Sequence, residues 1–257
     1  HSLPPNDNFQ LNSSGTRALA GGNVMRLFGK GRNQLNRVDS ADERVVQLIE
    51  LHAAGAVVDV GANVGQYAQR MRAAGLTLPI VSFEPGGEAH GELVCAATED
   101  PAWTVAPRMA ISDVEGTATL NVNKRSDMNS LKPIADTTRT AFPKAKAMTE
   151  EEVATRRLDD VMDEFADLRD RSLFLKVDTQ GNELEVIRGA AGALDRIVAI
   201  QLEMSLVPMY EGESVYLVLL NELDRLGFDL HLVLPGYFSR ALGRQLQFDG
   251  LFIRRSK

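Results

Sequence analysis

The chain has 257 residues, of which 44% are hydrophobic and 25% are charged, the ordinary mixture of a soluble globular protein. Runs of about 18 consecutive apolar residues are absent, so no membrane-spanning helix is expected. The formal net charge of −7 is a poor basis for holding polyanionic nucleic acid, and we expect no such partner. A single cysteine, Cys95, excludes an internal disulfide and a multi-thiolate zinc site. No signal peptide is recognisable, which favours a cytoplasmic location.

Residues 1–38 are polar and rich in Asn, Gly and Ser, which predicts an N-terminal appendage rather than part of the main domain. A capping-box pattern then begins at Ser40, with Glu43 three residues later, and an apolar stripe follows. We therefore expect the main domain to cover residues 39–257.

From residue 56 onward, short apolar strands alternate with amphipathic helices. This order predicts an α/β fold with a mainly parallel, Rossmann-like sheet and helices on both faces. The last two predicted strands are joined through Pro235-Gly236 without a helix, which indicates an antiparallel strand at one edge, and a small hairpin is expected near 117–122. The predicted strands are 56–60, 80–83, 104–111, 173–177, 197–204, 229–234 and 248–253, and the predicted helices are 66–74, 88–97, 158–165, 182–188 and 215–226.

Residues 124–152 interrupt this alternation. The segment has few large apolar side chains, mixed charge, and prolines at positions 133 and 143. Loops of this length are usually functional lids or disordered segments. A substrate-covering lid and an incidental insertion both remain open.

The strongest local signal is the glycine-containing turn after the first strand of the alternating region. A dinucleotide-binding G-x-G-x-x-G motif fails here, because Asn63 and Gln66 occupy its second and third glycine positions. The spacing Asp59-x-Gly61-x-Asn63-x-Gly65 is instead that of an S-adenosylmethionine (SAM) loop. In this interpretation Asp59 helps to hold the ammonium end of SAM, while backbone groups of the turn hold its carboxylate and sugar.

Two further positions fit the same cofactor. Glu84 follows the next strand, at a distance from Asp59 close to the roughly 20 residues typical of a ribose-binding acid. Its carboxylate can accept hydrogen bonds from two adjacent hydroxyls. Ser112 or Asp113, after the third strand, would contact the adenine amino group, although a solvated turn explains these residues nearly as well.

The reaction centre is expected after the fourth strand, because ligands of doubly wound sheets bind beyond the carboxyl ends of the central strands. Lys176 is a charged residue inside an apolar strand, and Asp178 points to the same face. Asp178 is the first candidate for the general base or for the group that orients the acceptor hydroxyl, and a role as a helix N-cap or as a partner for Lys176 is the alternative. Glu203 could share the proton transfer, bind the acceptor or help Asp178 to hold a divalent cation, although such scattered carboxylates are weak evidence for a metal. His231 is the remaining candidate for proton transfer, although a single histidine in a strand is more often structural.

With these segments placed, the chain resembles the FkbM-type SAM-dependent methyltransferases over roughly residues 56–210. Six sequence blocks in the same order carry the resemblance. They are Asp59-Val60-Gly61-Ala62-Asn63-Val64-Gly65, Phe83-Glu84-Pro85, Ala110-Ile111-Ser112-Asp113-x-x-Gly116, Arg157-Leu158-Asp159-Asp160, Leu175-Lys176-Val177-Asp178-Thr179-Gln180-Gly181-x-Glu183 and Arg188-Gly189-Ala190.

The resemblance implies a seven-stranded methyltransferase sheet with one reversed edge strand, and O-methylation of sugar or polyketide hydroxyls. The family's acid after the fourth strand is replaced by Gln180 in this chain, so that position loses a charge. This variant, together with the segment around Tyr210, resembles sugar-modifying members, and Ser130 lies in a patch similar to a family Ser-Ser-Leu motif. Lys176, Gln180, Ser130 and Tyr210 are therefore candidates for contact with the substrate.

Three functions compete. The leading hypothesis is O-methylation of a sugar hydroxyl in a glycolipid, glycan or glycosylated small molecule, with a peripheral membrane location if the acceptor is lipid-linked. Protein or nucleic-acid methylation is the second, and the Asn/Asp-Pro-Pro-Tyr signature of base methylation is missing. A non-catalytic SAM-binding scaffold is the third, and the combination of Asp59, Gly61, Glu84 and Asp178 argues against it.

Overall fold

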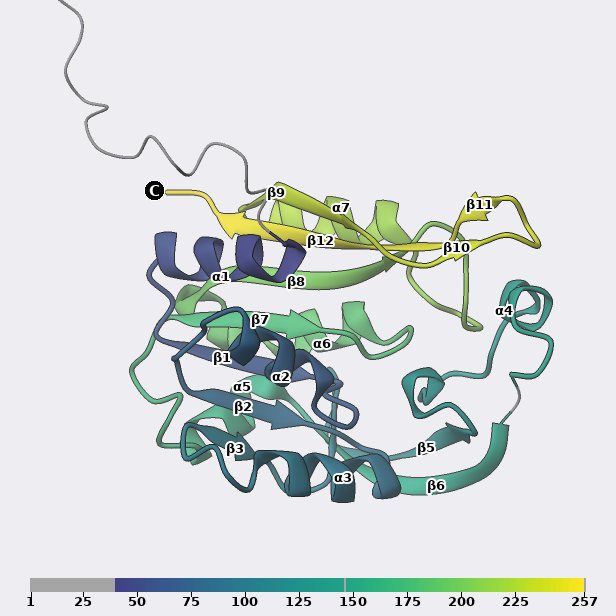
Figure 1. Cartoon of the computed structure of the whole chain (residues 1–257), viewed down its shortest axis with the longest axis horizontal. Helices are drawn as coiled ribbons and strands as arrows, with labels where there is room; N and C mark the ends of the chain where they lie inside the picture. Colours follow the sequence, from purple (N-terminus) through teal and green to yellow (C-terminus); the bar gives the residue numbers. More distant parts are fainter. Residues whose placement is uncertain (1–39, 146, 257) are drawn as a thin grey trace, which may run out of the picture. The chain divides into compact units, whose positions relative to one another are not determined.

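The computed structural model describes residues 40–145 and 147–256, with only the backbone considered at 147 and 148 (Figure 1). The appendage predicted for residues 1–38 lies outside this range. Helix α1 (Ala41–Leu51) begins at the predicted capping box: the Ser40 hydroxyl accepts from the backbone N–H of Glu43, and the Glu43 carboxylate accepts from the N–H of Ser40. Within the described residues, no helix is both long and apolar enough to cross a membrane.

The main sheet has seven strands in the order β3-β2-β1-β7-β8-β12-β9, which confirms the predicted α/β fold. The first five strands of this order are parallel to one another. Strand β12 runs antiparallel to both β8 and the outermost strand β9, which provides the antiparallel pairing expected near one edge. The strands are β1 (Ala56–Val60), β2 (Ile80–Phe83), β3 (Trp103–Val105), β7 (Leu173–Val177), β8 (Ile197–Ser205), β9 (Phe228–Pro235) and β12 (Gln247–Arg254).

Helices cover both faces of this sheet. Alternate residues of each central strand point to opposite faces, so each strand contributes side chains to both layers of the core. Val57 and Phe174 pack against α1, α2 and α3 on one face, whereas Val58 and Leu175 pack against α5, α6 and α7 on the other. The remaining helices are α2 (Gln66–Ala73), α3 (Gly87–Ala97), α5 (Leu158–Val161), α6 (Glu183–Gly189) and α7 (Tyr216–Arg225), with short 3-10 turns at Met162–Glu164 and Ala191–Arg196.

The strand predicted at 104–111 is wrong as a single element. Strand β3 ends at Val105, and the chain leaves the sheet before the separate strand β4 (Ala110–Ile111). Pro107 explains the break, because proline has no N–H to continue a hydrogen-bonded ladder. As a result, the end of the predicted strand joins a second sheet.

This second sheet has the order β4-β6-β5, with β5 (Gly116–Asn123) and β6 (Ala147–Arg156) antiparallel. Strand β5 contains the hairpin arm predicted at 117–122. Residues 124–152 carry more secondary structure than a loop: a 3-10 turn at Ser126–Met128, helix α4 (Asp136–Ala141) and the first half of β6. A short hairpin of β10 (Phe238–Ser239) and β11 (Arg244–Gln245) connects β9 to β12.

Candidate active site

A cavity of about 290 Å³ lies beyond the carboxyl ends of β1, β2, β7 and β8, where doubly wound sheets bind their ligands. Residues 125–131 and Phe142 of the segment predicted as a lid or insertion form part of its wall. The cavity therefore lies between the sheet and this segment. Of the predicted site residues, those lining it are Gly61, Asn63, Glu84, Ser130, Lys176, Asp178, Gln180, Glu203 and Tyr210.

The turn after β1 depends on three residues with positive φ. Gly61 has φ +78°, and a Cβ at this position would overlap the backbone carbonyl of Asp178. The close approach that requires glycine at position 61 is thus to the end of β7. Asn63 has φ +50°. Gly65 (φ +90°) lies outside the cavity wall, at the start of α2, where a Cβ would come 2.6 Å from the ring of Trp103.

Glu84 connects the ends of β1 and β2. One carboxylate oxygen accepts from the backbone N–H of Asn63 and the other from that of Gly86, each at 2.8 Å. The side chain lines the cavity although only 5% of the residue is exposed. Burial raises the pKa of Glu84 to about 7, and the two backbone hydrogen bonds limit the increase. This carboxylate has lone pairs left for ligand hydroxyl groups.

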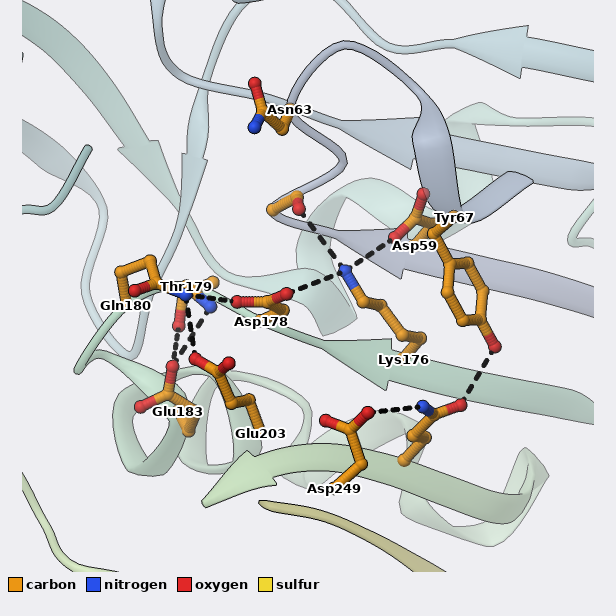
Figure 2. Close-up of polar contacts among 12 residues, drawn as sticks. Asp59, Asn63, Tyr67, Lys176, Asp178, Thr179, Gln180, Glu183, Glu203 and Asp249 are labelled. Atoms are coloured by element: carbon orange, nitrogen blue, oxygen red, sulfur yellow. Dashed lines mark hydrogen bonds and ion pairs between the residues drawn. The ribbon is translucent and has the colours of Figure 1, made fainter. Parts of the chain in front are cut away.

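Asp59 is completely buried and does not reach the cavity, contrary to its predicted contact with the cofactor. Its Oδ1 lies 3.3 Å from Nζ of Lys176, which also lies 3.6 Å from Oδ2 of Asp178 and donates to the carbonyl of Gly61 (Figure 2). Burial alone would lower the pKa of Lys176, but the two carboxylates raise it above its ordinary value. Lys176 stays charged and links the turn after β1 to the end of β7. Lys176 is bound to these three partners and is only 6% exposed, so it contributes little surface to the cavity wall.

Two carboxyl groups, those of Asp178 and Glu203, share one amide. Nε2 of Gln180 donates to Oδ1 of Asp178 at 2.6 Å and to Oε2 of Glu203 at 2.7 Å. The hydroxyl of Tyr210 donates to Oε1 of Gln180 at 2.7 Å and fixes the orientation of the amide. Burial, reinforced by Asp178 and Asp249, raises the pKa of Glu203 well above its ordinary value. The structure thus joins the two residues predicted for proton transfer to two of those predicted for substrate contact.

The loop that carries Gln180 is held from two sides. Glu183 accepts from the backbone N–H groups of Thr179 and Gly181. From the opposite side, the Ser130 hydroxyl donates to the carbonyl of Gln180 at 2.6 Å, and Nζ of Lys132 donates to the carbonyl of Gly181 at 2.6 Å. The 124–152 segment therefore positions the loop, and the predicted Ser130 belongs to that contact.

Besides Asp59 and Gly65, three further predicted site residues are not brought to the cavity. Ser112 and Asp113 lie outside its wall, and the backbone of Ser112 packs closely against Gly189 of α6. His231 lies on the outermost strand β9, exposed, at a register irregularity, and its ring contacts that of His52. These placements do not support contact of Ser112 or Asp113 with adenine, nor proton transfer by His231.

Several cavity residues were missed by the sequence interpretation. Asp249 pairs directly with Glu203 across the β8–β12 ladder, and burial raises its pKa to about 6. Gln247 also donates to Oε2 of Glu203, at 2.7 Å. The only signal in the sequence is the presence of polar residues in an otherwise apolar C-terminal strand. Among the described residues, no group of three or more His, Cys, Asp or Glu could hold a metal ion.

The order of the strands is that of a doubly wound α/β sheet in which β12 runs antiparallel to its neighbours. A family model, the methyltransferase FkbM domain, matches residues 59–230, and the chain therefore belongs to the FkbM methyltransferase family. This match confirms the resemblance identified in the sequence.

No curated protein matches the sequence. Among solved structures, the chain is similar to magnesium protoporphyrin IX methyltransferase from Synechocystis PCC 6803 with bound SAM, with 11% identity, a TM-score of 0.44, and coverage of 83% of this chain and 78% of that one. It is also similar to an rRNA methylase from Streptococcus thermophilus, with 10% identity, a TM-score of 0.45, and coverage of 86% and 100%.

Proposed function

We propose that the protein transfers the methyl group of SAM to a hydroxyl group of a sugar-containing acceptor. SAM, when bound, supplies an electrophilic methyl group on a sulfonium centre. The observation that carries the proposal is that Glu84 and Asp178 line one cavity, at the ends of β2 and β7, and are joined through the turn after β1. The carboxylate of Glu84 suits contact with ribose hydroxyls, and the carboxylate of Asp178 suits the transfer of a proton.

The residues present fit SAM. Glu84 would hold the ribose hydroxyls, because its carboxylate faces the cavity and keeps free lone pairs. Oδ1 of Asn63 is buried and has no hydrogen-bond partner in the described part of the chain, which leaves an acceptor for a polar ligand group. Phe83, Met109 and Ile111 supply an apolar wall that suits a nucleobase.

Asp178 is the proposed general base. Methylation of a hydroxyl oxygen releases its proton, so a carboxylate within reach is required. The ammonium group of Lys176, 3.6 Å from Oδ2, stabilises negative charge on Asp178. Burial and the neighbouring Asp178 raise the pKa of Glu203 above its ordinary value, which favours its protonated form. Gln180 keeps the two groups together, so that one can accept a proton while the other holds one.

A sugar acceptor is supported by the composition of the cavity wall near Asp178. Gln247, Asp249, Tyr210 and Tyr237 bring carboxylate, amide and phenol groups to the cavity, and such groups suit a ligand rich in hydroxyls. Nucleic acid is disfavoured as acceptor, because the chain is acidic and the cavity wall carries the carboxyl groups of Glu203 and Asp249 beside the proposed base Asp178.

The proposal is tested in two steps. Calorimetric titration of the folded protein with SAM should show binding at one site, and a lack of binding would contradict the proposal. A transfer screen with methyl-labelled SAM against lipid and glycan extracts of the host, followed by mass spectrometry, should then identify a methylated sugar. Labelling confined to protein or nucleic acid would overturn the choice of acceptor while leaving methyl transfer intact.

A further inference from the structure

The hairpin that joins β9 to β12, residues 236–246, exposes apolar and cationic side chains together. Phe238 is 53% exposed, Tyr237 37% and Leu242 36%. Arg240 and Arg244 are exposed too, and neither has an ion-pair partner among the described residues. The hairpin contains no acidic residue, although the whole chain has a net charge of −7. Its charge is therefore opposite in sign to that of the protein.

The hairpin is fixed beside the cavity. Tyr237 lines the cavity and stacks on Phe142, with ring centroids 4.5 Å apart and planes inclined by 29°. At the base of the hairpin, buried Leu246 packs with Ile134 and Tyr210. Figure 1 shows β10, β11 and α4 at the same end of the sheet, the end toward which the arrows of β7 and β8 point. A surface bound by the hairpin would thus lie next to the cavity.

The nearby acidic residues do not neutralise the hairpin. Asp136 of α4 and Glu211 both pair with Arg139, at 2.8 and 3.6 Å. Arg240 and Arg244 are consequently available for anionic groups outside the chain. Partly exposed aromatic and leucine side chains flanked by unpaired arginines are the combination that binds the interface of a bilayer with anionic lipids.

We propose that residues 236–246 dock on the surface of a bilayer that contains anionic lipid and hold the cavity against a lipid-linked acceptor. The apolar side chains would enter the interface while the two guanidinium groups bind lipid phosphates. The identity of the acceptor rests on the proposed function, but the docking itself does not. A glycolipid acceptor could then present its sugar to Asp178 without leaving the membrane.

Vesicle flotation tests the docking with the full chain. Vesicles of phosphatidylcholine alone are compared with vesicles containing about one third phosphatidylglycerol, at low and physiological salt. The protein should bind the anionic vesicles more tightly, and salt should weaken the binding. Replacing both arginines (Arg240→Gln with Arg244→Gln) should weaken it by about 30-fold, since each basic side chain contributes roughly fivefold. Phe238→Ser with Leu242→Ser should remove most of the remaining binding.

A matched control comes from helix α7, where Leu217 and Val218 are 54% and 46% exposed. Leu217→Ser with Val218→Ser should leave vesicle binding unchanged. Equal binding of the Phe238/Leu242 variant and the unmodified chain would overturn the proposal. So would a dimer in solution that this variant converts to a monomer, because the hairpin would then be a protein interface.

SAM titration of the same variants separates the two proposals. Phe238, Arg240, Leu242 and Arg244 do not line the cavity, so SAM affinity should not change when they are replaced. For the unmodified chain, vesicle binding without SAM binding would leave the docking standing and end the proposed function. For the same unmodified chain, SAM binding without vesicle binding would do the reverse.

Discussion

The backbone carbonyl of Asp178 occupies the space that a side chain on Gly61 would fill. The N–H of Asp178 also donates to the carbonyl of Val60, at 3.0 Å. The turn proposed to hold the cofactor and the residue proposed to take the proton are therefore one packed unit. Their relative position is set by backbone contacts before any ligand binds, which is the preorganisation that a methyl transfer requires.

Gly61→Ala should abolish SAM binding and lower the free energy of unfolding by about 2–4 kcal/mol. The added Cβ would overlap the backbone carbonyl of Asp178, and alanine would also have to adopt the φ of +78° that glycine has here. Gly75→Ala is the control: φ there is +101°, but nothing lies within 4 Å, so only the backbone strain of about 1 kcal/mol is expected. Denaturant titrations measure both. Similar losses in the two variants would show that the contact with Asp178 carries no cost.

Lys176→Met should lower the free energy of unfolding by about 3–5 kcal/mol, because it leaves the fully buried Asp59 carboxylate without its cation. Adding Asp59→Asn to this variant removes the unpaired charge and should recover about 2 kcal/mol or more. Urea denaturation of the two single variants and the double variant measures the coupling. Additive losses would contradict a buried ion pair between these residues.

Asp178→Asn should lower kcat for methyl transfer by about 10²–10⁴-fold while SAM affinity changes by a few-fold at most. Glu203→Gln should retain activity within about tenfold near neutral pH, because glutamine resembles the protonated acid that the raised pKa of Glu203 favours. Initial rates with the acceptor identified in the transfer screen measure both. A greater loss in Glu203→Gln than in Asp178→Asn would reverse the assignment of the base.

The ligand-free protein should lose stability as the pH rises from about 5 to 8. The native pKa of Glu84 is raised from 4.5 to about 7, so the native state binds more protons than the unfolded state in this range and stability falls as the pH increases. The contribution of Glu84 is roughly 2–3 kcal/mol. Glu84→Gln should flatten the dependence measured by denaturant titration at several pH values, and an unchanged slope would contradict a raised pKa.

Most of the fold could be predicted from the sequence, because its strands are apolar runs separated by helices with recognisable starts. The break after Val105 and the pairing of β4 with β6 could not be predicted. Pro107 indicates an interruption of the strand, but the sequence does not show that the residues after it pair with β6 in a second sheet. Similarly, residues 124–152 have few large apolar side chains, and their secondary structure depends on contacts with β5 and with the loop that carries Gln180.

The site was predictable where residues follow parallel strands, because the ends of such strands meet at one edge of the sheet. Glu84, Asp178 and Glu203 were found in this way. Asp249 was missed because β12 is antiparallel, and only its register beside β8 brings the residue opposite Glu203. Asp59 was assigned to the ligand because its motif does not reveal that Lys176 lies between it and the cavity, a contact made across the β1–β7 ladder.

The most direct test of the central claim is a crystal structure of the protein with S-adenosylhomocysteine. We predict that the ribose hydroxyls contact the carboxylate of Glu84 and that the sulfur faces Asp178 from within the cavity. A ligand bound away from the end of β1, or an Asp178 carboxylate directed away from the sulfur, would contradict the account.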